Sequence, residues 1–234
     1  MRRLTMALAV LFCAAVLWLG WRQIVEVIPA SLDYRHRPKV IIDPGHGGED
    51  GGAVGINDAI EKDINLSISL MLRDLLRISG FEVIMTRDTD LSIHDPSAKT
   101  LSQKKTSDLK NRLALMKQHP DALVLSIHQN KFTQEKYSGA QVFYGTQLPQ
   151  ASSMLAQTIQ DNIKAQLQPE NYREIKESYD TLFLLRNAPM PIVLVECGFL
   201  SNRREAELLS DPAYQKQMAF VIYISALEYL QNNP

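Results

Sequence analysis

Short apolar runs alternate along the chain with longer stretches in which apolar residues recur every three or four positions. The short runs predict buried strands at 39–43, 81–87, 122–128, 139–145, 181–186 and 191–199. The helical spacing predicts helices at 59–79, 107–118, 150–167, 203–209 and 212–231. This alternation favours an α/β fold with a mostly parallel, mixed sheet of about six strands and helices on both faces.

Local signals place some ends of these elements. Gly80 follows the first predicted helix and is a candidate C-cap, and Asp211 followed by Pro212 predicts the start of the last helix. The polar stretches 91–108 and 168–180 predict surface loops. A loop as long as the first of these is often a functional lid.

The first 30 residues differ in pattern from the rest. Arg2 and Arg3 precede an apolar stretch that extends to Gly20, a length between that of a signal-peptide core and that of a short spanning helix. We expect an N-terminal hydrophobic helix within 1–30, retained as a membrane anchor in preference to being cleaved. The polar segment 31–38 then predicts a linker to a folded domain at 39–234 outside the cytoplasm.

Composition narrows the classes of function. With 234 residues, 45% of them hydrophobic, the chain can bury one sizeable core. A formal net charge of -1 gives no basic field, so nucleic acid is not an expected partner. Cys197 is the only cysteine of the folded domain, which excludes an intramolecular disulfide there and predicts a packed, inert thiol.

Four residues that carry chemistry lie where predicted strands end or the next helix begins. His46, His128 and Glu196 each follow or close an apolar run, and Glu61 lies at the start of the first helix. The carboxyl ends of parallel strands share one edge of a sheet, so we expect the four side chains to converge there. Two imidazoles and a carboxylate are typical ligands of catalytic zinc, which leaves Glu196 available as a general base.

Each of these residues also has a structural explanation. Asp58 and Glu61 match an Asp-led variant of the capping box, so Glu61 can simply cap a helix. His128 can be a strand-end histidine that the backbone satisfies. Glu196 is harder to explain in this way, because a carboxylate that closes the run PIVLV is costly to bury unless it is paired or functional.

The glycine-rich stretch IIDPGHGGEDGG, at 41–52, matches no phosphate or calcium motif. It lacks the Gly-Lys-Ser/Thr of a P-loop, the third glycine of a dinucleotide loop, and the alternating acids of an EF-hand. We interpret its glycines as residues that allow sharp turns beside His46.

Six motifs, in order along 39–230, resemble the zinc-dependent N-acetylmuramoyl-L-alanine amidases of bacteria. They are DPGHGGEDGGAVG, EKDINL, MTRDTD, SIHQN, SGAQVFY and VECGFLSN. The resemblance implies that His46, Glu61 and His128 bind Zn2+ and that Glu196 is the catalytic glutamate. The implied reaction is hydrolysis of the amide between the lactyl group of N-acetylmuramic acid and the L-alanine of the stem peptide.

Further expectations follow from this resemblance. Lys131 stands where the family commonly has alanine. The resemblance assigns no role to Asn130, Glu49 and Asp50, which we predict to contact substrate; for Glu49 and Asp50 the alternative is a position that only faces water. The short chain is most similar to germination-specific members, which act on spore cortex peptidoglycan and contribute to muramic-delta-lactam. We therefore expect peptidoglycan as partner, action between the forespore membranes, and an accessory protein that assists zinc loading.

Two other functions fit the same residues. A carboxypeptidase-like zinc peptidase would need an arginine or a similar clamp for a free carboxylate. A non-catalytic peptidoglycan-binding protein on the same fold would be expected to lack some of the ligands, whereas all of them are present here.

Overall fold

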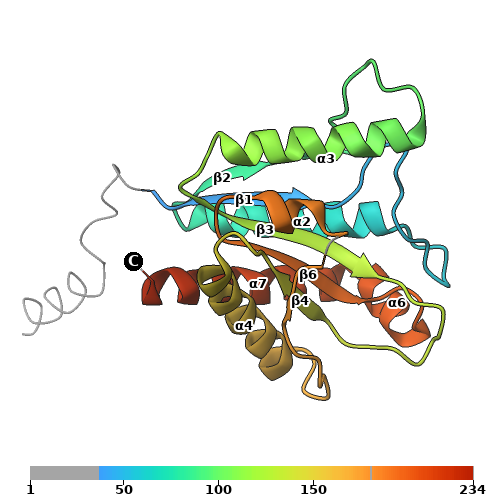
Figure 1. Ribbon diagram of the computed structural model, residues 1–234. Helices are drawn as coiled ribbons and strands as arrows, with labels where there is room; N and C mark the ends of the chain where they lie inside the picture. Colours follow the sequence, from blue (N-terminus) through green and yellow to red (C-terminus); the bar gives the residue numbers. More distant parts are fainter. Residues whose placement is uncertain (1–36, 180, 234) are drawn as a thin grey trace, which may run out of the picture. The chain divides into compact units, whose positions relative to one another are not determined.

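The computed structural model describes residues 37–179 and 181–233 (Figure 1). The predicted hydrophobic helix within 1–30 and most of the predicted linker lie outside the described residues. Within the part of the chain that is described, no helix is long and apolar enough to cross a membrane. The fold below is that of the unit that begins at Pro38.

One mixed six-stranded sheet forms the centre of this unit, as the alternating pattern predicted. The strands lie in the order β2 (Glu82–Met85), β1 (Lys39–Pro44), β3 (Ala122–Asn130), β6 (Ile192–Phe199), β4 (Gln141–Tyr144) and β5 (Lys176–Glu177). The first four of these are mutually parallel, and β4 runs antiparallel to β6. The parallel strands therefore end at one edge of the sheet, where the ligand site of such folds is expected.

Helices cover both faces of this sheet, and each face has its own apolar core. On one face lie α2 (Glu61–Ile78), α4 (Pro149–Gln166) and α7 (Pro212–Asn232). On the other face lie α3 (Leu101–Lys117) and the short α5 (Phe183–Asn187). A further helix, α6 (Arg203–Ser210), packs against α7 and β6.

The packing of α2 shows why the helical spacing was a reliable signal. Ile64, Ile68, Leu72 and Leu76 recur every fourth residue and are all buried against the sheet. The helix ends at Ile78, and Gly80 adopts a φ of 88°, which allows the chain to turn into β2. Helix α2 thus begins at the carboxyl edge of the sheet and runs toward the opposite edge.

Two predictions of secondary structure were wrong. The run TLFLLR, at 181–186, was predicted as a strand, but most of it lies in α5, which begins at Phe183 and buries Leu184 and Leu185 on the α3 face. The sixth strand is instead the exposed pair Lys176–Glu177, within a stretch predicted as loop. A short apolar run does not distinguish a strand from a turn of buried helix, and a two-residue edge strand leaves no periodic signal.

The predicted loop at 91–108 is shorter than expected. Helix α3 begins at Leu101, because Thr100 accepts a hydrogen bond from the backbone of Gln103 while the Gln103 side chain accepts one from the backbone of Thr100. This capping box starts the helix six residues before the first predicted position. The loop that remains, at 91–100, lies beside the carboxyl edge of the sheet.

Candidate metal centre

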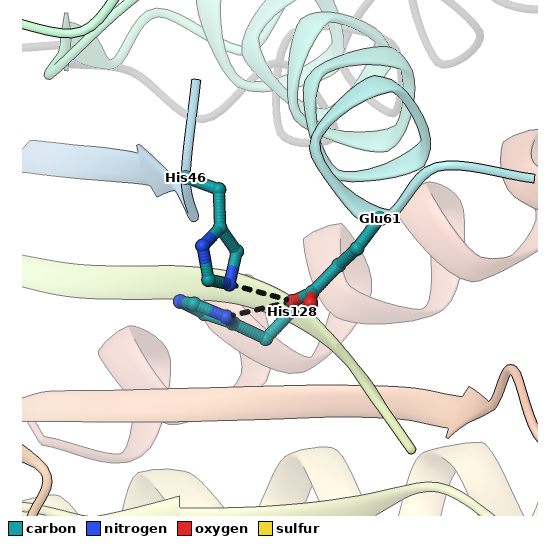
Figure 2. A group of neighbouring side chains, drawn as sticks. All are labelled: His46, Glu61 and His128. Atoms are coloured by element: carbon teal, nitrogen blue, oxygen red, sulfur yellow. Dashed lines mark hydrogen bonds and ion pairs between the residues drawn. The ribbon is translucent and has the colours of Figure 1, made fainter. Parts of the chain in front are cut away.

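Three of the predicted residues meet at the carboxyl edge of the sheet (Figure 2). His46 follows β1, Glu61 is the first residue of α2, and His128 lies near the end of β3. One side-chain ligand atom from each lies within 4.8 Å of the others. The Glu61 carboxylate is 3.2 Å from Nε2 of His46 and 3.0 Å from Nδ1 of His128. Two imidazole nitrogens and one carboxylate oxygen at this spacing are suitable ligands for a metal ion such as zinc.

The structural explanation for Glu61 is wrong. Helix α2 begins at Glu61 itself, its N-cap is Ile60, and no side chain caps it. Instead the Glu61 carboxylate is buried and accepts hydrogen bonds from the backbone of Ala53 at 2.8 Å and of Gln129 at 3.1 Å. Asn65, one turn along α2, also donates to it at 3.3 Å. These bonds fix the carboxylate between the two histidines.

Two glycines leave room for the ligand side chains. A Cβ atom on Gly45 would collide with the ring of His128. A Cβ atom on Gly52 would lie 2.5 Å from Oε2 of Glu61 and 2.7 Å from Cδ2 of His46, and Gly52 has a φ of 68°. The sequence indicated only that these glycines allow sharp turns. The structure gives them a second role, because a side chain at either position would displace His46, Glu61 or His128.

Asp50 orients His46. Nδ1 of His46 lies 2.9 Å from a carboxylate oxygen of Asp50, whose other oxygen pairs with Lys105 at 2.8 Å. A carboxylate on the second ring nitrogen fixes the tautomer that presents Nε2 to a metal. The sequence pattern did not predict this contact, although the spacing of four residues could have suggested it.

The acidic neighbours change the protonation of the site without metal. Burial lowers the pKa of His46, but hydrogen bonds and charge from Asp50 and Glu61 outweigh it and raise the pKa to about 9. Burial raises the pKa of Glu61, and the two histidines outweigh it and hold that pKa far below its ordinary value. Without metal, the raised pKa keeps His46 protonated at neutral pH, and its imidazolium forms ion pairs with Asp50 and Glu61.

Glu196 lies beside this cluster, on β6. It is the register partner of His128 across the β3–β6 pair. Among the residues that the structure describes, its buried Oε2 atom has no hydrogen-bond partner. Burial raises the pKa of Glu196 to about 7, with His128 acting in the opposite direction. A buried carboxylate oxygen with no partner is expensive unless it serves a ligand or a reaction.

The other predicted site residues surround this centre. Asn130 is the last residue of β3 and is half-buried. Glu49 is exposed and pairs with Lys104 of α3 at 2.5 Å. Both Glu49 and Asp50 line a hollow of about 200 Å³ between the metal cluster and α3, which His94 also lines. Contact of Asn130, Glu49 and Asp50 with substrate stays a prediction.

Two buried arginines, which the sequence did not single out, contact the turn that carries His46. Arg112 of α3 donates to the carbonyl oxygens of Pro44 and His46, both at 2.7 Å. Arg87, from the MTRDTD motif, donates to Pro44 at 3.0 Å and to Gly45 at 2.9 Å. Through Arg87, the MTRDTD motif therefore contacts the turn that carries His46.

Cys197 is fully buried, and burial raises the pKa of its thiol far above the ordinary value. The prediction of a packed thiol agrees with this environment, since a nucleophilic cysteine requires a lowered pKa.

The fold and the site together define the class of the protein. A mixed α/β sheet carries at its carboxyl edge two histidines and a glutamate that could hold a metal ion, beside a buried glutamate oxygen with no hydrogen-bond partner among the described residues; this arrangement is typical of a hydrolase. The chain belongs to the N-acetylmuramoyl-L-alanine amidase family, whose family model matches residues 40–227.

Individual relatives agree with this assignment. The chain is 39% identical over 190 residues to the germination-specific N-acetylmuramoyl-L-alanine amidase of Bacillus subtilis, covering 81% of this chain and 78% of that protein. It is also similar to the CwlD amidase of Clostridioides difficile, which was solved in complex with the GerS lipoprotein. The TM-score of that match is 0.81 and the sequence identity is 42%, and it covers 84% of this chain and 100% of that chain. An N-acetylmuramoyl-L-alanine amidase of Clostridium difficile 630 matches with a TM-score of 0.72 and 30% identity over 85% and 99% of the two chains.

Proposed function

We propose that this amidase uses zinc to hydrolyse the amide between N-acetylmuramic acid and the L-alanine of the stem peptide. The observation that carries the proposal is the cluster of His46, Glu61 and His128, with ligand atoms within 4.8 Å of one another. Nitrogen and carboxylate ligands of this kind suit zinc better than calcium or magnesium, which prefer oxygen ligands alone.

These three residues would hold the ion, and their surroundings support that role. Asp50 orients one imidazole, and backbone amides of Ala53 and Gln129 fix the Glu61 carboxylate. When bound, zinc supplies a Lewis acid that polarises the scissile carbonyl and activates water for attack. The histidines must be neutral to bind it, so the proton on His46 has to leave.

Glu196 is proposed as the group that moves protons. Its buried Oε2 atom is free of protein partners in the described part of the chain, and its pKa of about 7 allows it to accept and return a proton near neutrality. In this role it takes a proton from the attacking water and gives it to the nitrogen of L-alanine as the amide bond breaks. Its position beside His128 brings it to the same edge of the sheet as the ligands.

The two buried arginines beside the candidate metal centre are not free to act as the clamp of a carboxypeptidase-like peptidase. A carboxypeptidase needs a cation that is free to bind the terminal carboxylate of its substrate. Arg87 and Arg112, which contact the metal-binding turn, are buried, and their donors are occupied by carbonyl and carboxylate oxygens.

The variant Glu196→Gln tests this mechanism. We expect it to retain zinc, measured by elemental analysis of the purified full chain. We also expect it to release stem peptides roughly 100- to 10,000-fold more slowly than the wild type, the usual contribution of a positioned acid–base. The products are identified by mass spectrometry, in which a free L-alanine amine marks amidase cleavage. Near wild-type turnover in the zinc-loaded variant would overturn the role of Glu196.

In the cell, we propose that the protein acts on spore cortex peptidoglycan and contributes to muramic-delta-lactam, together with a deacetylase. This is supported by the similarity to a germination-specific amidase. We further propose extracytoplasmic action, with the segment 1–30 as the membrane anchor. An accessory protein that assists zinc loading is also proposed, since the similar CwlD amidase was solved with the GerS lipoprotein.

A comparison of two substrates tests the cortex assignment. Cortex-type and vegetative peptidoglycan are incubated separately with the zinc-loaded full chain, and the released peptides are measured by mass spectrometry. Preferential release from the cortex material is the expected result. Equal release from both would contradict the germination-specific role while leaving the amidase activity intact.

A further inference from the structure

We propose that Arg112 and Arg87 are positioning residues that hold the turn 44–46 in the conformation that presents His46 to the metal. The inference rests on the proposed metal centre and extends it to residues that touch neither the metal nor the substrate. It is carried by the strained backbone of His46 and by the bonds that two guanidinium groups make to three successive carbonyl oxygens.

The turn needs external support because of its backbone conformation. His46 has a φ of 62°, in the left-handed region that a residue with a Cβ atom rarely adopts. Such a conformation persists only where the surrounding structure holds it. In this conformation Nε2 of His46 points toward Glu61, so a relaxed backbone would move the ligand away from the other two.

Arg112 provides the first set of contacts. It is 2% exposed, and it reaches from α3 to a turn 66 residues earlier in the chain. One terminal nitrogen donates to Asp43 and to the carbonyl of Pro44, and the other donates to the carbonyl of His46, all at 2.7 Å. Its Nε atom donates to Asp108 at 2.5 Å. The carboxylates of Asp43 and Asp108 compensate its buried charge, and it also donates hydrogen bonds to the carbonyl oxygens of the turn.

Arg87 completes the support from the side of β2. Its Nε atom donates to the carbonyl oxygen of Pro44. One terminal nitrogen donates to the backbone carbonyl oxygens of Gly45, at 2.9 Å, and of Lys62, at 2.8 Å. Lys62 follows the ligand Glu61 in α2. Arg87 therefore connects the turn that carries one ligand to the first turn of the helix that carries another.

Replacement of Arg112 by lysine separates positioning from charge balance. An ammonium group can still neutralise Asp43, but it lacks the planar fork that bonds two carbonyls and two carboxylates at once. We expect Arg112→Lys to weaken Zn2+ binding by about 10- to 100-fold, as is usual for groups that orient metal ligands. The affinity is measured on the full chain by competition with a chromogenic chelator, and the stability of the metal-free protein by urea unfolding.

Ser126→Ala is the matched control. Ser126 is buried and donates to the other oxygen of Asp43 at 2.7 Å, so its loss weakens the same buried network without touching the carbonyls of the turn. We expect this variant to lose stability and to bind Zn2+ within about twofold of the wild type, because its effect on stability is not transmitted to the ligand. A loss of affinity in Ser126→Ala that follows its loss of stability would overturn the inference.

Two further variants make the result decisive. Unchanged Zn2+ affinity in Arg112→Lys contradicts the positioning role. If that variant does not fold, Arg87→Lys is expected to weaken Zn2+ binding in the same way, and unchanged affinity in it contradicts the role equally.

His46→Ala tests the metal centre itself. If the wild type binds no Zn2+, or if His46→Ala binds it equally well, the proposed metal centre fails. If His46→Ala loses binding while the arginine variants do not, only the positioning role fails.

Discussion

Replacement of Gly52 by alanine tests whether the metal centre depends on a position without a side chain. The added Cβ atom would lie 2.5 Å from Oε2 of Glu61 and 2.7 Å from Cδ2 of His46, so both ligands would have to move. The oxygen concerned already accepts the backbone N–H of Ala53 at 2.8 Å, which restricts the direction in which it can retreat. One methyl group is therefore expected to disturb two ligands together.

The size of the effect has two parts. A φ of 68° costs alanine roughly 1–2 kcal/mol in backbone strain. The collision with the ligands adds the cost of an overpacked site, about 1–3 kcal/mol. If the ligands yield, the second part appears as a loss of metal affinity of roughly 5- to 150-fold.

The variant Gly48→Ala separates the cost of backbone strain from the cost of the collision with the ligands. Gly48 has a φ of 59°, so alanine suffers similar strain there, but its Cβ atom would meet the backbone of Ser92 at 3.2 Å and no metal ligand. Urea unfolding of the metal-free proteins should show a loss of stability in both variants, and chelator competition should show weaker Zn2+ binding in Gly52→Ala alone. Equal Zn2+ affinity in the two variants would refute the steric reasoning.

Three further predictions concern the neighbours of the site. At about pH 9 and above, where the proton that competes with Zn2+ for His46 is largely lost, Asp50→Asn should weaken Zn2+ binding by about 10- to 100-fold, because the Asp50 carboxylate orients His46. Glu49→Gln should leave the affinity unchanged, and calorimetric titration of both variants at that pH decides this. Since the pKa of metal-free His46 is about 9, Zn2+ must displace its proton, and the affinity should rise about tenfold per unit from about pH 7 to about pH 9. A flat profile over that range would contradict a protonated His46. Native Cys197 should resist iodoacetamide and react after denaturation, as measured by mass spectrometry, because burial raises its pKa and covers its sulfur.

The fold was predictable where burial enforces a period and less so where it does not. In α2 the sheet requires an apolar residue at every turn, so Ile64, Ile68 and Leu72 define the helix in the sequence. Helix α3 buries little apolar surface and begins at a capping box, so the polar residues before 107 gave no periodic signal. In 181–186 the apolar residues face a core in either conformation, and only the packing against α3 selects the helix.

The candidate ligands were predictable because topology brings them to one edge of the sheet. Parallel strands end at the same edge, so a histidine after β1 and another near the end of β3 lie in the same region before any detail of packing is known. The supporting residues depend on how far a side chain reaches in three dimensions. No spacing in the sequence indicates that Arg112 would bond to the carbonyl of a residue 66 positions earlier.

The roles of Asp50 and Gly52 follow from the same distinction. In the sequence, the glycines after His46 indicated only a turn, and the acids among them had no assigned partner. In the structure, Asp50 fixes the ring of His46, and Gly52 leaves the space in which that ring meets Glu61. The candidate metal centre therefore combines three features in one short loop: a candidate ligand, a carboxylate that orients it, and a position kept free of side-chain atoms. The first is visible as a residue type, and the other two appear only once the loop is closed against α2.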